Sequence, residues 1–320
     1  MAGMKRRTTG QISGENVVIE VAWMYYRDGL NQKDIAERLD ISRATVVNYL
    51  QEARERGLIR ITLADAAFTT HRLAQALCAR FGLRAAYVVP DEGLEEPAAF
   101  DRVVQGAAEW LPALLAPGDR LGVAWGRTVY ELAEAIEPQR IDDLAVLQLV
   151  GSMASPYGFT AEACSTRLAE QLGARCYNLH SPAILSNAPL AVALRAEPII
   201  AAQLDRLRTV NKFLFSVGTC QPDSHVVGAG VATRADLDAN IAQGAVGVLC
   251  GRFIDAQGRA IPGPMEARMI GVPLPQLTGL DMGILVTPGH DKVAATHAAI
   301  RGGYVTHLVT GLTVAEALLA

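Results

Sequence analysis

Residues 31–51, NQKDIAERLDISRATVVNYLQ, constrain the fold more than any other stretch, because they carry two short helical patterns separated by a single turn. Each pattern places apolar residues on one face at helical spacing. The first face is formed by Ile35, Ala36 and Leu39, and the second by Val46, Tyr49, Leu50 and Ala53. Ser42 can cap the second helix, and Asp40 stands in the turn, where a short polar side chain tolerates a left-handed backbone. The stretch therefore predicts a helix-turn-helix.

The outward face of the second predicted helix combines Arg, Asn and Gln with small apolar residues. In the DNA major groove, Arg reads guanine, Asn or Gln reads adenine, and small apolar groups touch the thymine methyl. A purely structural helical hairpin would show similar spacing, but the small Ala36 at the helix crossing and the immediate restart at Ser42 favour a DNA reader. The predicted DNA-binding residues are Gln32, Ser42, Arg43, Ala44, Val47, Asn48 and Gln51.

Flanking segments complete a first domain over residues 1–63. An apolar stripe over residues 15–27 predicts the third helix that a helix-turn-helix needs to bury its hydrophobic face, and Gly29 ends it. After the recognition helix, Gly57 is a C-terminal stop. The run at 58–63 reads as a short strand, either one arm of a wing beside the DNA or a link outward.

Composition excludes several classes of protein. The 320 residues are 50% hydrophobic and 19% charged, as in folded globular chains. Net charge is −4, divided into +2 over residues 1–60 and −6 over the rest, which fits a DNA reader joined to a separate acidic module. No apolar run approaches the roughly 20 residues that cross a bilayer. The scattered cysteines and histidines show no metal or disulfide spacing, so we expect a cytoplasmic protein without metal or cofactor.

The sequence pattern changes after a predicted linker helix at 64–84. Short apolar runs then alternate with helical stretches through residues 85–320, which predicts an α/β domain with a mainly parallel sheet covered by helices on both faces. The strand candidates are AAYVV, RLGVA, LAVLQLV, RCYNL, KFLFSV, AVGVL, MGILV and YVTHLV. The helix candidates span residues 98–115, 128–137, 161–173, 189–207, 234–243, 290–301 and 313–319.

Ligands of open parallel sheets sit beyond the carboxyl ends of the strands, so the turns after each strand are the places to search. Gly122–Thr128, GVAWGRT, runs from a strand through a Gly-containing turn into a helix. Such a turn offers backbone amides, a hydroxyl and a guanidinium to a phosphate, although an ordinary tight turn explains the spacing equally well. It is neither a Walker loop nor a dinucleotide fingerprint. Lys292, after another strand, could pair with an anionic ligand or be a solvated surface charge.

Several motifs together resemble the SorC family of bacterial sugar-responsive transcriptional regulators, also described with the DeoR-like group. The head at 21–63, GVAWGRT, GAVGVLCGRFID and PGHDKVAATHAAIRGGYVTHLVTG occur in the family's order. The resemblance implies a sugar-phosphate-isomerase-like (NagB/RpiA/CoA-transferase-like) effector-binding domain. By motif, the effector phosphate would be held by Trp125, Gly126, Arg127, Thr128 and Lys292. Where the family often has an acidic residue after GAVG, this chain has Val248.

These observations predict a transcriptional regulator of a carbohydrate or polyol catabolic operon. Its expected partners are double-stranded operator DNA, a phosphorylated sugar or polyol effector, and further copies of itself in a dimer or tetramer. The main alternative is a sugar-phosphate isomerase or deaminase, but fold does not transfer activity and the post-strand turns hold no convincing carboxylate pair with His. No catalytic residue is predicted. An architectural DNA-binding protein without ligand leaves the large acidic α/β body unexplained.

Overall fold

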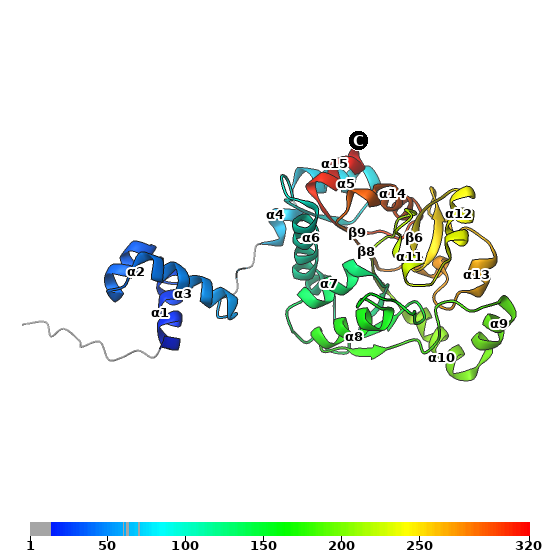
Figure 1. Ribbon diagram of the computed structural model, residues 1–320, viewed down its shortest axis with the longest axis horizontal. Coiled ribbons are helices and arrows are strands. Elements are labelled where there is room, and N and C mark those ends of the chain that lie inside the picture. The colour runs from blue at the N-terminus through cyan, green and yellow to red at the C-terminus, as the bar shows by residue number, and fades with distance from the viewer. Residues whose placement is uncertain (1–13, 60, 62–63, 70) are drawn as a thin grey trace, which may run out of the picture. The chain divides into compact units, whose positions relative to one another are not determined.

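The computed structural model describes residues 14–59, 61, 64–69 and 71–320, and the chain divides into two compact units, residues 1–63 and 64–320 (Figure 1). The first unit holds the predicted helix-turn-helix and the second the predicted α/β fold. Within the described residues, no helix is both long and apolar enough to span a membrane.

The described residues of the first unit form three helices: α1 (Gly14–Tyr26), α2 (Gln32–Leu39) and α3 (Arg43–Glu55). They bury one small core made of Val21, Met24, Ile35, Ala36, Val46 and Leu50. Val18, Ala22 and Ala53 pack beside it and join α1 to α3. The apolar faces read from the sequence are therefore the ones that meet inside this unit.

The turn chemistry at Asp40 and Ser42 follows the sequence prediction, and Asn31 adds a cap that was not predicted. Asn31 caps α2, since its Oδ1 accepts hydrogen bonds from the amides of Lys33 and Asp34 at 2.9 and 3.0 Å. Asp40 ends the helix in the left-handed region at φ 55°. Ser42 caps α3 by accepting from the Thr45 amide at 3.0 Å. These caps set the tight turn that separates the two helices.

The predicted strand at 58–63 is not confirmed where the structure describes it. Residues 58, 59 and 61 are irregular, and the remaining positions of that stretch lie outside the described residues. Gly57 closes α3 at φ 66°, and the Leu58 amide donates back to the Ala53 carbonyl at 2.9 Å. A strand also needs a partner strand, and the described residues of this unit form none.

A seven-stranded parallel sheet is the centre of the second unit, with strand order β1-β9-β8-β5-β2-β3-β4. The strands are β1 (Ala85–Val89), β2 (Arg120–Val123), β3 (Ala145–Gln148), β4 (Arg175–Tyr177), β5 (Lys212–Phe215), β8 (Met282–Thr287) and β9 (His307–Gly311). Apart from the sheet, β6 (Ala245–Leu249) and β7 (Arg252–Asp255) form an antiparallel hairpin. The parallel prediction is confirmed, whereas AVGVL belongs to the hairpin.

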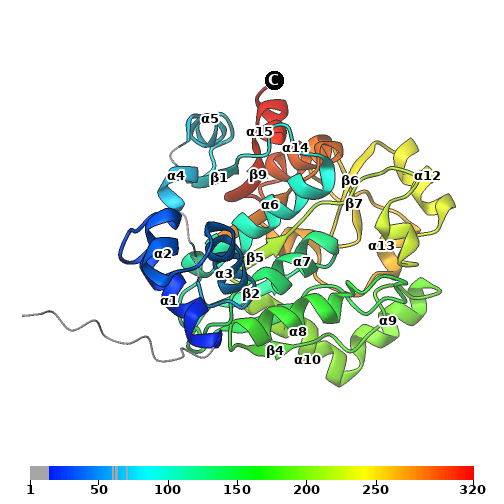
Figure 2. The ribbon, with the colours of Figure 1, turned by 60° about the vertical axis from the view of Figure 1, so that its left-hand side comes forward.

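Helices cover both faces of the sheet, as predicted (Figure 2). Alternate residues of β1 show the two sides, because Tyr87 and Val89 join one core cluster while Ala86 and Val88 join the other. The first face is covered by α6 (Glu96–Trp110), α7 (Arg127–Ala135) and α8 (Ala161–Gln171). The second face carries α5 (Arg72–Phe81), α14 (Val293–Arg301) and α15 (Leu312–Leu319).

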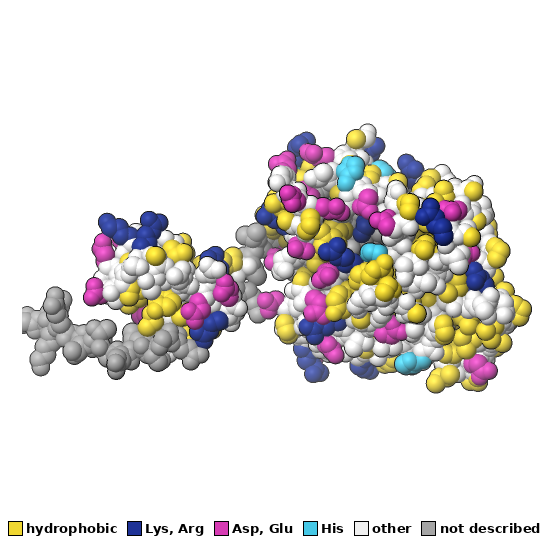
Figure 3. All heavy atoms as spheres, viewed as in Figure 1, with side chains coloured by type: hydrophobic (Ala, Val, Ile, Leu, Met, Phe, Trp, Pro, Cys, Tyr) yellow, Lys and Arg dark blue, Asp and Glu magenta, His cyan; other side chains and the backbone are white. Residues whose placement is uncertain are grey.

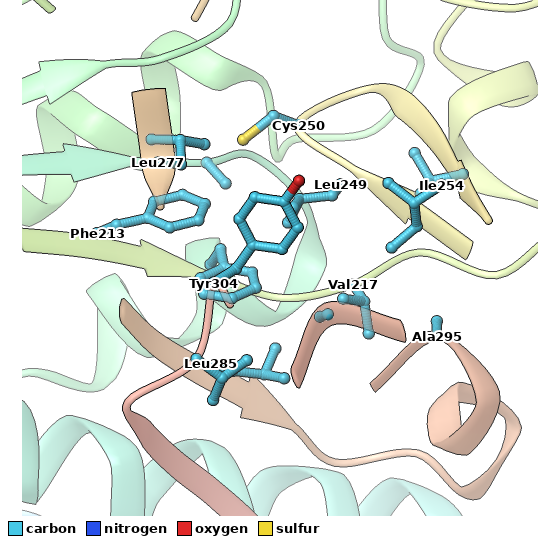
Figure 4. Close-up of a cluster of buried hydrophobic side chains, with 14 of the residues drawn as sticks. Phe213, Val217, Leu249, Cys250, Ile254, Leu277, Leu285, Ala295 and Tyr304 are labelled. Atoms are coloured by element: carbon cyan, nitrogen blue, oxygen red, sulfur yellow. The ribbon is translucent and has the colours of Figure 1, made fainter. Parts of the chain in front are cut away.

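The second core also holds the hairpin against the sheet. Figure 4 shows Phe213 and Leu285 from the sheet beside Leu249 and Ile254 from the hairpin, with Tyr304 between them. The Tyr304 hydroxyl donates to the Gly258 carbonyl at 2.9 Å, which satisfies its only polar group. Shorter elements complete the unit: α4 (Asp65–Thr69), α9 (Ala188–Ala196), α10 (Pro198–Arg206), α11 (His225–Gly228), α12 (Arg234–Ala242), α13 (Pro264–Arg268), and the 3₁₀ turns Leu111–Leu114, Leu207–Thr209, Leu274–Leu277 and His290–Lys292.

Two predicted helices differ from those observed. The stretch 64–84 forms α4 and α5 rather than a single linker helix, and it lies within the second unit because Leu73, Ala74 and Leu77 are buried in its core. The predicted helix 189–207 is divided into α9 and α10, because Pro198 lacks the amide that would continue the first helix.

Candidate functional site

A cavity of about 340 Å³ opens at the carboxyl ends of β2, β5 and β8, the sheet edge where a ligand site is expected. Residues following those three strands line it, together with the start of α6, the segment before α11 and the turn of the hairpin. Its lining residues are Glu96, Phe100, Trp125, Gly126, Arg127, Thr128, Ser216, Val217, Gly218, Thr219, Asp223, Ser224, His225, Val226, Val248, Cys250, Gly251, Pro288, Gly289, Asp291 and Lys292.

All five effector-binding residues predicted from the sequence line this cavity. Gly126 caps α7 at φ 131°, a conformation that side-chain-bearing residues rarely adopt, and it leaves the first turn of α7 open to the cavity. Thr128 is buried behind it. Cys164 supports the turn from α8, with its Sγ 3.7 Å from the Gly126 carbonyl oxygen. The helix terminus is thus held in place where Gly126, Arg127 and Thr128 line the cavity.

Two cations that lie far apart in the sequence, Arg127 and Lys292, share the cavity. Arg127 extends over the Phe100 ring, with its Cζ 4.3 Å from the ring centroid. The Lys292 Nζ lies 3.4 Å from the Thr128 hydroxyl and 3.5 Å from the Ser216 hydroxyl. Within the described residues, neither cation has a carboxylate at salt-bridge distance. Their positive charge is therefore available to a ligand.

Burial lowers the pKa of Lys292 below its usual value; Asp291 opposes that shift, while Arg127 adds to it. The effect of Arg127 on this pKa shows that the two cations repel each other across the cavity. An anion between them would relieve that repulsion and raise the pKa of Lys292.

Groups of other chemistry occupy the remaining walls. Three carboxylates, those of Glu96, Asp223 and Asp291, border the cavity and can accept hydrogen bonds from hydroxyls. Burial lowers the pKa of His225; Lys292 lowers it further, Asp223 opposes the shift, and Arg127 adds to it. The cavity also has an apolar wall made of Val217, Val226 and Val248.

The hairpin turn reaches the same cavity in a strained conformation. Cys250 and Gly251 join β6 to β7 with φ 49° and 76°, the pattern of a two-residue turn with both residues left-handed. Burial raises the pKa of Cys250 to about 12, so its thiol stays protonated and inert at neutral pH.

Sequence reasoning missed the cavity residues that come from distant elements. Glu96 and Phe100 lie on α6, Asp223 lies in the connection after β5, and His225 begins α11. Nothing in their local sequence signals the site. Gly218 did have a signal, since it follows the predicted strand KFLFSV directly, whereas Ser216 lies within that predicted strand. The turns after β3 and β4, at 151–153 and 181–182, do not line the cavity, and Ser152 pairs there with Pro182.

The predicted DNA-binding residues lie on α3 and at the start of α2. Arg43, Ala44, Asn48 and Gln51 are exposed, and Val47 is 39% exposed, so all of them can face a groove. The Arg43 Nε donates to the Gln32 Oε1 at 3.2 Å, which orients the guanidinium at the beginning of α3. Gln51 donates to Glu55 at 2.8 Å, and the exposed Ser42 caps the helix.

Known proteins resemble the chain over both units. The Sugar-bind family model, a sugar-binding domain, matches residues 65–320, and a MarR family model matches residues 21–67. The uncharacterized transcriptional regulator YjhU of Escherichia coli K12 is 34% identical across 98% of this chain and 97% of its own length. The deoxyribonucleoside regulator of Bacillus subtilis is 30% identical across 95% of this chain and 97% of its own. The chain belongs to the SorC family of sugar-binding transcriptional regulators.

A solved structure agrees with this membership at the level of the fold. The full-length sorbitol operon regulator SorC from Klebsiella pneumoniae matches with a TM-score of 0.80 and 24% identity, covering 97% of this chain and 100% of that one. As a SorC-family member, the chain is a DNA-binding transcriptional regulator controlled by an effector. The fold and function predicted from the sequence are confirmed at this level.

Proposed function

We propose that this SorC-family regulator binds operator DNA through the exposed face of α3 and responds to a phosphorylated sugar or polyol held in the 340 Å³ cavity. The observation that carries the proposal is the pair of cations, Arg127 and Lys292, beside the open N-terminus of α7. Together they offer a guanidinium, an ammonium and free helix amides to one anionic group. A phosphate fits this combination best.

The rest of the cavity suits the hydroxylated part of such an effector. Glu96, Asp223 and Asp291 can accept hydrogen bonds from sugar hydroxyls, and Ser216 can donate or accept. The volume falls within the roughly 300–1,000 Å³ of small-molecule sites. The names of two relatives, a deoxyribonucleoside regulator and a sorbitol operon regulator, support a carbohydrate or polyol operon as the target.

On the DNA side, we propose that Arg43, Asn48 and Gln51 contact base edges, while Ser42 and Gln32 help to place the helix against the backbone. One recognition helix reads too few base pairs to select a site in a genome, so the regulator should act as a dimer or tetramer on paired half-sites. Its place of action is the bacterial cytoplasm, where the operator lies.

Paired ligands test the effector proposal. The melting temperature of the full-length protein is measured with phosphorylated sugars and polyols and, in parallel, with the same compounds lacking phosphate. We expect stabilisation by at least one phosphorylated compound, of about 2.7 kcal/mol at 100 times its Kd, and none by its unphosphorylated partner. Equal stabilisation by both members of every pair would contradict a phosphate site at Arg127 and Lys292.

The fold leaves one enzymatic candidate to test, because the cavity brings together the carboxylates and His225 that an isomerase could use. We propose that the site binds without turnover. Incubation of each stabilising sugar phosphate with the protein, followed by chromatography of the products, distinguishes the two functions. Conversion that disappears in a His225→Ala variant would favour the enzyme.

A further inference from the structure

Helix α1 exposes an apolar stripe that the core of the first unit does not use. Ile19, Trp23 and Tyr26 are 47%, 60% and 36% exposed and recur at helical spacing along one side. The opposite side of α1 packs into the interior of this unit through Val18 and Val21. Figure 3 shows hydrophobic side chains at the surface of this unit. A Trp exposed to this extent in so small a unit indicates a contact surface.

Charges along one edge of this stripe indicate what covers it. Glu20 and Arg27 are exposed; Glu20 lies one turn before Trp23, and Arg27 lies one turn after it. At 100° per residue, both charged side chains flank Trp23 on one edge, whereas Ile19 and Tyr26 flank it on the other. The charged edge is therefore acidic toward the N-terminus and basic toward the C-terminus, which complements a copy of itself running in the opposite direction.

We infer that α1 pairs antiparallel with α1 of a second copy of this chain, related by a two-fold axis near Trp23. In that arrangement Trp23 meets the partner's Trp23, and Ile19 lies opposite the partner's Tyr26. Along the paired helices, Arg27 lies within one residue of the position opposite the partner's Glu20. Each dimer therefore gains two ion pairs.

The alternative direction fits less well. In a parallel pair, two-fold symmetry sets each edge of the stripe against the opposite edge of the partner helix. Glu20 and Arg27 would then face the partner's Ile19 and the partner's Tyr26, and charged groups would lose water without gaining a partner. Only the antiparallel direction joins apolar edge to apolar edge and charged edge to charged edge.

This contact rests on the proposed function, since a regulator of paired half-sites needs two recognition helices held at a fixed separation. The α1 stripe lies on a different helix from Arg43 and Asn48, so the pairing does not use those two residues. The contact is isologous, because one patch serves both copies. It assigns to the first unit a role in assembly as well as in reading DNA.

Crosslinking in the full-length chain tests the two-fold contact. Trp23→Cys should give a covalent dimer under mild oxidation, because the axis brings the two residues together. Lys33→Cys, at an exposed position of α2, is the matched control, and the wild type gives the background of the five native cysteines. Dimer formation at or below the control level, in a protein that is dimeric by light scattering, would overturn the inference.

Charge reversal in the Trp23→Cys background gives an independent readout. Arg27→Glu turns two attractions into two repulsions, so the rate of crosslinking should fall about tenfold, and Glu20→Arg should do the same. The double variant, with Glu20→Arg and Arg27→Glu together, exchanges the two charges and should restore the rate. Slower crosslinking that the double variant does not restore would contradict the antiparallel register.

Selection from a random DNA pool keeps this inference apart from the proposed function. A folded wild-type dimer that enriches no sequence refutes the DNA-binding proposal. A wild-type protein that enriches paired half-sites, combined with a Trp23→Cys variant that does not crosslink, refutes only the α1 contact.

Discussion

The exposed face of α3 and the effector cavity are built in opposite ways. The DNA-binding residues lie within about three turns of one helix plus Gln32, and neighbouring caps at Asn31, Asp40 and Ser42 place them. The cavity takes its residues from positions 96 to 292, and only the folded sheet brings them together. A recognition surface formed by contiguous sequence is visible in that sequence, whereas a pocket formed by strand order is visible only in part.

The two sites also differ in electrostatic state. Arg43 on α3 is solvent-exposed and already oriented by Gln32, so its charge costs little before DNA arrives. Lys292 in the cavity has a pKa lowered by burial, with Asp291 opposing and Arg127 adding to the shift. The α3 face is ready to bind, whereas the cavity holds unfavourable charge that an anion would relieve. Ligand binding at such a site can shift the conformational equilibrium of the protein.

The largest effect is expected from breaking the core beneath the α3 face. Val46 is fully buried, and Val46→Asp places an unpaired carboxylate among Val21, Ile35 and Leu50. Because so small a core supplies roughly 3–5 kcal/mol, we expect the first unit to unfold and operator binding to vanish. The thermal stabilisation by effector should persist, because the cavity lies within the second unit.

Val47→Asp is the matched control for Val46→Asp, since Val47 is the next residue of α3 and is exposed. It should weaken DNA binding by adding negative charge while the helices stay folded, as measured by circular dichroism and affinity. If Val46→Asp kept native helix content and DNA affinity, the assignment of Val46 to the core would be refuted.

In the cavity, Arg127→Ala should cost about 1.5–3 kcal/mol of effector binding, the usual value of a hydrogen bond to a charged group. Arg140→Ala is the control, because Arg140 is an exposed arginine paired with Asp142 at 3.0 Å. Isothermal titration with the stabilising sugar phosphate measures both. Operator affinity without effector should be unchanged in each variant, and an unaltered effector affinity in Arg127→Ala would move the phosphate site elsewhere.

On α3, Asn48→Ala should cost about 1–3 kcal/mol on the selected operator and much less on random DNA, because a base contact is lost. Lys33→Ala, at an exposed position of α2, serves as a control for the loss of a polar surface side chain. Competition binding against both DNAs gives the specificity ratio. An equal loss on operator and random DNA would make Asn48 a backbone contact.

Particular residues show how far the sequence could predict this molecule. The Ser42 cap, the Asp40 turn and the apolar faces of 31–51 are predictable from the sequence, because they depend on neighbours within one or two turns. The parallel sheet was also predicted, since buried strands alternating with helices permit few other arrangements. By contrast, β7 was missed, because Arg252–Asp255 carries charge at both ends and pairs only with the strand just before it.

The cavity shows the limit more clearly. Trp125–Thr128 and Lys292 were found by motif, and the structure places them on one cavity. Phe100, which lies under the Arg127 guanidinium, sits on α6 and is indistinguishable in sequence from an ordinary core residue. Its place at the cavity depends on the strand order of the sheet, in which β9 and β8 lie between β1 and β5. No local sequence pattern specifies that order.

The smallest effect concerns the unfavourable charge in the cavity. Lys292→Met removes a half-buried cation whose pKa is lowered by desolvation, with Asp291 opposing and Arg127 adding to the shift. Without effector, the variant should therefore gain about 0.5–2 kcal/mol in stability while losing its response to effector.

The pH dependence of this gain tests its cause. In the wild type, the unfolded state holds the ammonium proton of Lys292 more tightly than the folded state does. The penalty is therefore complete below the folded pKa and fades as pH rises from there toward the ordinary lysine value. The stability difference between variant and wild type, measured by denaturant titration, should shrink over that window. A difference that is constant with pH would show that packing rather than charge explains the gain.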